Sequence, residues 1–214
     1  MSTPQHSKII NKIAREILKP IGVSRKGQSR TWLDDNGWWV IVIEFQPSAW
    51  SKGTYLNIGI NWQWYPKTHF SFDLGYRELE FIQNISDTQF EHKVKEMAAT
   101  AKRKIEVIRQ NMSDIKTAKS YVIDASNNKP LTIWSQFHMG MICALANSPN
   151  EAVCYFQNVL ESPDKQDWAI RLKEYTKELS VLVTSNHDLK THLCNVVNES
   201  RALKKLGEWE CMLP

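Results

Sequence analysis

Hydrophobic and polar residues repeat along the chain with two different periods. In residues 9–18 the apolar positions recur every three to four residues, with basic and acidic side chains between them, until Pro20 interrupts the pattern. This spacing predicts an amphipathic helix. A longer pattern of the same kind covers 90–112, and it follows Ser86-Asp87-Thr88-Gln89, which has the form of a capping box. A long second helix is therefore predicted behind it.

Between these two helices the pattern is that of β-strands. Asn36-Gly37 separates two β-rich runs, 29–33 and 38–46, and Asn-Gly in this position is a strong hairpin signal. Two further runs, 55–65 and 69–74, alternate between apolar and polar residues. We predict four antiparallel strands in a meander, with the long helix lying across the apolar face of the sheet.

A three-residue loop, 66–68, places the apolar residues of the last two strands on the same face. In that register His69 lies beside Tyr65 and Asp73 lies beside Asn61. The other face of the sheet is then largely polar.

The remainder of the chain is helical by pattern. Residues 124–130 include two Asn, one Ser and one Pro, and they predict a linker. Four runs of helical spacing with short loops predict an antiparallel bundle, and they cover 134–145, 152–160, 168–183 and 189–206. We therefore expect an α+β fold with two domains. Residues 1–124 form a sheet domain packed by the N-terminal and long central helices, and residues 131–214 form the helical C-terminal region.

The composition is that of a globular protein. Hydrophobic residues make up 42% and charged residues 23% of the 214 residues, which argues against disorder. No apolar run approaches the roughly 18 residues of a membrane span, and residues 1–12 lack the apolar core of a signal peptide. We expect a soluble cytoplasmic protein without membrane contact. The four cysteines fit no zinc template and are expected to be reduced; they are Cys143, Cys154, Cys194 and Cys211.

Three segments carry a resemblance to a known family. They are 17–22 (ILKPIG) followed by Arg25 and Lys26, 42–48 (VIEFQPS), and 53–60 (GTYLNIGI). Over about residues 8 to 120 the chain resembles the bacterial family catalogued as domain of unknown function 4304, although Val23 stands where the family favours Phe. The resemblance implies a bacterial cytosolic protein with an α+β core and supplies no reaction and no catalytic residues. Some such families act as immunity or defence components.

Two surfaces are candidates for binding. Trp50 stands in a polar loop, 47–53, where an exposed indole would anchor a partner; a lid packed on the core is the alternative. The polar sheet face offers hydrogen-bonding groups and a general base, and a solvent-facing sheet is the simpler explanation. Glu44 interrupts a buried strand and needs a partner such as Arg77. The predicted binding residues are Trp50, Lys52, Tyr55, Asn57, Asn61, Gln63, Tyr65, His69, Asp73 and Arg77.

Basic side chains suggest a third surface, which would meet phosphate groups. They are Arg25, Lys26 and Arg30, and on the long helix Lys95, Lys102, Arg103 and Arg109. The acids Glu91, Glu96 and Glu106 dilute the helical part, so a solvated face is the simpler explanation there.

Catalytic and metal-binding signals are weak. His187 and His192 are five positions apart and do not share a helix face as metal ligands would. The sequence has no glycine-rich phosphate loop and no nucleophile elbow. We therefore predict no metal and no cofactor, and we leave the catalytic residues unassigned.

Taken together, these patterns favour a non-enzymatic module that binds a protein partner. The C-terminal helices would provide homo-oligomer formation or a second contact surface. Binding of nucleic acid through the basic N-terminal third and the central helix is the first alternative. A hydrolase-like enzyme that uses the polar sheet face is the second alternative.

Overall fold

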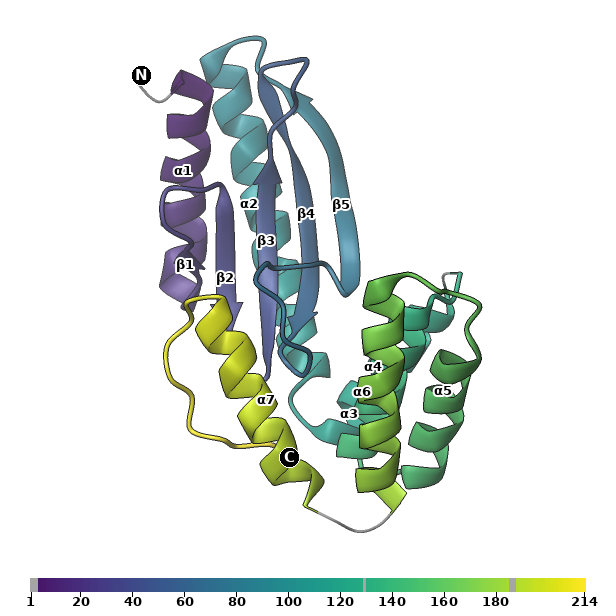
Figure 1. Ribbon diagram of the computed structural model, residues 1–214. Coiled ribbons are helices and arrows are strands. Elements are labelled where there is room, and N and C mark those ends of the chain that lie inside the picture. Colours follow the sequence, from purple (N-terminus) through teal and green to yellow (C-terminus); the bar gives the residue numbers. More distant parts are fainter. Residues whose placement is uncertain (1–3, 129, 185–187) are drawn as a thin grey trace. The chain divides into compact units, whose positions relative to one another are not determined.

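The computed structural model describes residues 4–128, 130–184 and 188–214 (Figure 1). The chain packs into two compact units. One unit contains the residues up to Gln63 together with His69–Ile108, and the other contains Trp64–Thr68 together with Arg109–Pro214. The sequence-based prediction ends the first domain at residue 124, whereas the first compact unit of the structure ends at Ile108. Residues 115–127 form a helix of the second unit, so a helix occupies much of the expected linker.

A five-stranded antiparallel sheet forms the centre of the first unit (Figure 1). Its strands follow each other in chain order, which confirms the predicted meander, with one strand more than expected. They are β1 Ser24–Arg25, β2 Thr31–Asp35, β3 Trp39–Gln46, β4 Gly53–Trp62 and β5 Leu74–Gln83. The Asn-Gly turn joins β2 to β3: Gly37 has a φ of 81°, and the amide of Asn36 donates to the carbonyl of Trp39 at 3.0 Å.

The predicted last strand, 69–74, is wrong. Residues 63–73 form a loop, and β5 starts only at Leu74, which pairs with Ile60. The Asp73 carboxylate accepts the backbone amide of Trp62 at 2.9 Å, and this contact fixes where the pairing begins. His69 therefore does not pair with Tyr65. Asp73 does lie beside Asn61, through a side-chain hydrogen bond of 3.0 Å.

Two helices cover one face of this sheet. They are α1 Gln5–Leu18, continued by the short 3-10 helix η1 Lys19–Ile21, and α2 Asp87–Asn111. Figure 1 shows α2 running behind β3 and β4. The core between helices and sheet is fully buried and aliphatic for the most part, as the sequence predicts. It includes Ile10, Ile13, Leu18, Ile41, Ile43, Ile58, Val94, Met97 and Ile105.

The second unit is helical, which confirms the helical C-terminal part. Its helices are α3 Ile115–Asn127, α4 Ile133–Leu145, α5 Pro149–Glu161, α6 Asp167–Thr184 and α7 Leu189–Leu203. Short polar residues start several of them: Asp114 accepts two amides at the start of α3, and Thr132 forms a capping box with Ser135 at the start of α4. No helix among the described residues is long and apolar enough to cross a membrane.

The C-terminal segment folds back along α7. The carbonyl of Gly207 accepts from the Arg201 guanidinium at 2.8 Å, and Cys211 forms a disulfide with Cys194 of α7, with Cα atoms 5.6 Å apart. The expectation that all four cysteines are reduced is therefore wrong for this pair. Sequence spacing did not reveal it, because the return of the tail depends on tertiary contacts. Cys143 is buried and Cys154 is exposed, and both are free thiols.

Candidate functional site

Trp50 is the most exposed large apolar side chain among the described residues. It lies in the loop between β3 and β4 with 95% of its surface exposed, so the alternative of a lid packed on the core does not apply. Ile85, in the turn before α2, is 78% exposed. The two loops are joined because the amide of Asn84 donates to the carbonyl of Lys52 at 2.9 Å. We call Trp50, Lys52 and Ile85 the tip.

Close strand packing holds the base of the tip. The β4 strand begins at Gly53, where an added Cβ would clash with the carbonyl of Ile82 and the ring of Phe81 in β5. The carbonyl of Gly53 also accepts from Arg30 at 3.3 Å. At the apex, the Trp50 amide donates to Ser48 Oγ at 3.1 Å. The indole is thus presented from a loop whose end is fixed by the sheet.

The predicted polar sheet face is not an open row of donors and acceptors. Asn57, Asn61 and Gln63 are each 0% exposed. Part of the cover comes from residues 69–73, which cross in front of the sheet (Figure 1). Phe72 lies over Gly59, where an added Cβ would approach its ring to 3.1 Å. A side chain at position 59 would displace this cover, so the missing Cβ has a packing role.

Asn57 links two charged residues of this face, Glu44 and Arg77. Its Nδ2 donates to Glu44 Oε2 at 2.8 Å and to Gln46 Oε1 at 3.0 Å, and its Oδ1 accepts from Arg77 Nε at 2.9 Å. The guanidinium of Arg77 also lies 3.9 Å from the centre of the Tyr55 ring. Glu44 therefore has the partner that its position requires, although Asn57 stands between it and Arg77.

A second buried network surrounds Asn61. Its Nδ2 donates to Ser71 Oγ at 2.9 Å and to Asp73 Oδ2 at 3.0 Å, while Ser71 Oγ donates to Asp73 Oδ1 at 2.7 Å. Gln63 donates to Asn61 Oδ1 at 2.8 Å. His69 is exposed and takes part in none of these bonds. The serine hydroxyl is thus bonded to a carboxylate rather than to an imidazole base, unlike a catalytic triad.

Tyr65 leaves the sheet and belongs to an aromatic cluster in the second unit. Its ring meets Trp134 at 5.0 Å and Tyr175 at 5.9 Å between ring centres, and burial raises the pKa of Tyr65. In the same unit Trp64 Nε1 donates to His138 Nδ1 at 3.0 Å. These contacts join segments that are far apart in the sequence, 74 positions for Trp64 and His138, and periodicity does not reveal such contacts.

The basic residues fall into two groups with different surroundings. On α2, Lys95 pairs with Glu91 at 3.2 Å, Lys102 pairs with Glu106 at 4.0 Å, and Arg103 donates to a threonine hydroxyl. Arg109 lies in the last turn of the same helix. Acids one helical turn away thus balance Lys95 and Lys102, as the solvated-face interpretation expects.

The second group lines a hollow of about 560 Å³ between α1 and the β1–β2 hairpin. Arg25 and Arg30 are in it, whereas Lys26 instead lies over the ring of Phe70 at 4.3 Å. Sequence reasoning missed three further cations on the α1 wall, Lys8, Lys12 and Arg15. Their spacing of four and three positions was the available signal, because it places them on one helix face. We call this hollow the basic groove, and it is lined by Ser7, Lys8, Asn11, Lys12, Arg15, Arg25, Gln28 and Arg30.

No family model, curated protein or solved structure matches the chain. The resemblance to the family of unknown function therefore stays a prediction.

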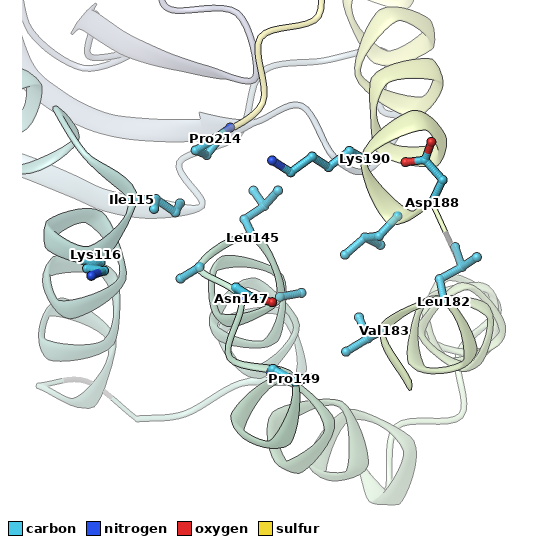
Figure 2. A pocket seen from close by; sticks show the side chains of 13 residues that line it. Ile115, Lys116, Leu145, Asn147, Pro149, Leu182, Val183, Asp188, Lys190 and Pro214 are labelled. Carbon is cyan, nitrogen blue, oxygen red and sulfur yellow. The ribbon is translucent and has the colours of Figure 1, made fainter. Parts of the chain in front are cut away.

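A hollow of about 590 Å³ also exists in the second unit (Figure 2). Figure 2 shows Leu145, Leu182 and Val183 around it, together with Lys190 and Asp188 from the start of α7. The Asp188 carboxylate caps α7 by accepting the amide of Thr191 at 2.9 Å, and the hydrogen bonds from Thr191 lower the pKa of Asp188. That acid is therefore engaged in helix capping.

His187 and His192 were the histidines considered as metal ligands in the sequence. His187 lies outside the described residues, and the ring of His192 lies 5.9 Å from that of Tyr175. Within the described ranges, no three His, Cys, Asp or Glu side chains gather so that they could hold a metal ion.

Proposed function

We propose that this protein is a non-enzymatic module that binds a protein partner through the tip. The observation that carries the proposal is the 95% exposure of Trp50. A tryptophan side chain buries about 150–250 Å² when it enters a pocket. Removing such an area from water is worth about 4–6 kcal/mol before the costs of association are subtracted. Tryptophan is also among the residues that most often dominate binding interfaces.

The surroundings of Trp50 define the partner that would fit. Ile85 adds a second exposed apolar side chain on the loop that is bonded to the Trp50 loop, and Lys52 adds a positive charge within the Trp50 loop itself. The complementary surface is an apolar pocket with an acidic rim. The resemblance to a family of unknown function adds the expectation of an immunity or defence role in a bacterial cell.

The polar sheet face supports the tip rather than forming the contact. Asn57, Asn61 and Gln63 are buried and hydrogen-bonded to their neighbours, so none of them is open to a partner in this fold. Of the ten predicted binding residues, Trp50 and Lys52 therefore form the proposed contact. No observation favours the hydrolase alternative.

A comparison of Trp50→Ala with a matched exposed substitution tests the proposal. Val181 is 60% exposed and lies in α6, so Val181→Ala removes apolar surface in the other unit. Each protein, immobilised, is incubated with nuclease-treated bacterial lysate, and captured proteins are purified for a direct affinity measurement. We expect Trp50→Ala to lower the affinity for the purified partner at least about thirtyfold, which is the loss typical of a binding hot spot. Val181→Ala should bind the partner as tightly as the wild type does. Equal affinity of wild type and Trp50→Ala for every captured protein contradicts the proposal.

A further inference from the structure

The basic groove gathers five cationic side chains, and none of the described residues that line it is acidic. Lys8, Lys12 and Arg15 come from α1, and Arg25 and Arg30 come from the β1–β2 hairpin. One carboxylate reaches its rim, since Glu91 Oε1 lies 3.8 Å from Lys12 Nζ. The same oxygen lies closer, at 3.2 Å, to Lys95. The groove therefore keeps a strong positive potential, which concave walls concentrate further.

The two arginines are held in place by neutral groups. Arg25 donates through Nε to the carbonyl of Ser29 at 2.7 Å and through Nη2 to that of Gln28 at 2.5 Å. Arg30 donates to Ser7 Oγ at 2.6 Å and to His6 Nε2 at 2.9 Å. Because none of these acceptors is a carboxylate, both guanidinium charges are oriented but not neutralised. Arg30 is also half-buried, and this burial lowers its pKa.

The spacing of the charges indicates what they would bind. Lys8, Lys12 and Arg15 follow each other along α1 over seven positions, or about 10 Å at 1.5 Å per residue. The arginines line the opposite wall. Two or three linked phosphate groups match a row of cations of this length better than a single anion does. Arginine forks also match the geometry of phosphate oxygens.

Three observations favour a compact ligand over a long strand of nucleic acid. The groove has a volume of about 560 Å³, which lies in the range of small-ligand sites. Within the described part of the chain, no aromatic ring on which a base could stack lines the groove. In addition, Lys95 and Lys102 on α2 would extend the basic surface for a nucleic-acid strand, but both are paired with glutamates. We propose that the basic groove binds a compact ligand with two or more linked phosphate groups.

Titration calorimetry with inorganic tripolyphosphate at low salt tests this proposal directly. The groove variant is Lys8→Gln/Lys12→Gln/Arg15→Gln, and all three residues are exposed on α1, so the fold should be retained. The matched control is Lys93→Gln/Lys102→Gln/Arg103→Gln on α2, which removes the same net charge outside the groove and leaves the Lys95–Glu91 pair intact. We expect saturable binding by the wild type, an affinity at least tenfold weaker in the groove variant, and a change within about twofold in the control. Circular dichroism melting curves verify that both variants are folded.

Two further ligands distinguish the sources of the phosphate groups. A nucleoside triphosphate that displaces tripolyphosphate and binds more tightly identifies a nucleotide as the ligand, and equal affinities identify the phosphate chain alone; both outcomes support the proposal. Absence of tripolyphosphate binding by the wild type overturns it, and so does an equal loss in both triple variants. Binding of a single-stranded oligonucleotide that tripolyphosphate cannot displace also overturns it, in favour of a nucleic-acid surface. Trp50→Ala should leave tripolyphosphate binding unchanged, so this proposal and the protein-binding proposal can fail separately.

Discussion

Replacing Asn57 by alanine should destabilise the protein by about 3 kcal/mol. The side chain is 0% exposed, and it bonds two charged groups, Glu44 at 2.8 Å and Arg77 at 2.9 Å. Hydrogen bonds to charged groups contribute about 1.5–3 kcal/mol each. Glu44 and Arg77 are half-buried, so water can replace part of each lost bond, and the lower value applies to both. The bond from Asn57 to Gln46 adds little, because Gln46 keeps its bond from Arg77 at 3.0 Å.

Urea unfolding followed by circular dichroism and tryptophan fluorescence measures this cost. A double-mutant cycle with Arg77→Ala isolates the contribution of the Asn57–Arg77 bond, because the second substitution should cost less once the first has removed their contact. We expect a coupling free energy of about 1 kcal/mol or more between the two positions. If Asn57→Ala costs under about 1 kcal/mol, or if the two substitutions add without coupling, then the network does not hold the sheet face together as described.

Three further outcomes are expected. Gly75→Ala should lower the free energy of unfolding in urea by at least about 2 kcal/mol, because φ is 100° and the new Cβ would lie 2.6 Å from the carbonyl oxygen of Ile58. Gly27→Ala is the control: φ is 53° there but the Cβ would meet no atom, so the loss should be about 1 kcal/mol. Alkylation of the native protein, followed by mass spectrometry, should modify the exposed Cys154 and spare Cys143, because burial raises the pKa of the Cys143 thiol to about 11. Cys194 and Cys211 should react only after their disulfide is reduced. Burial, Arg30 and Lys52 lower the pKa of His6 below its ordinary 6.5, so the unfolded state binds more protons and stability should fall as pH drops below 6.5; His6→Gln should flatten this dependence of the urea midpoint on pH.

Elements with a strong local signal could be predicted from the sequence. The Asn-Gly hairpin, the long helix behind Ser86 and the helical C-terminal region each depend on neighbouring residues alone, and the structure contains all of them. The last strand could not be located in this way, since both 69–74 and 74–83 suit a strand by local pattern. The contact between Asp73 and the Trp62 amide decides between them, and that contact depends on the fold.

The candidate sites show the same division between local and tertiary information. The polar neighbours of Trp50 suggested an exposed indole but left a lid packed on the core as the alternative, and its 95% exposure decides between the two. Alternation correctly placed Asn57 and Asn61 on the polar face, but it could not show that this face is covered, because part of the cover comes from Phe72 in a later segment. The basic groove was missed for a related reason: α1 and the hairpin each carry ordinary surface charges, and only their packing brings the two sets together.

Arg30 connects the two proposed surfaces of the first unit. Its Nη2 bonds Ser7 and His6 beside the basic groove, and its Nη1 donates to the carbonyl of Gly53 at the base of the tip. Removing the guanidinium would therefore disturb both surfaces and also leave a buried serine hydroxyl without this donor. If Arg30→Ala lost both partner binding and phosphate binding, the result would test neither of the two proposals. The substitutions that separate the two proposals lie at side chains that serve one surface alone: Trp50 at the tip, and the exposed cations of α1 in the groove.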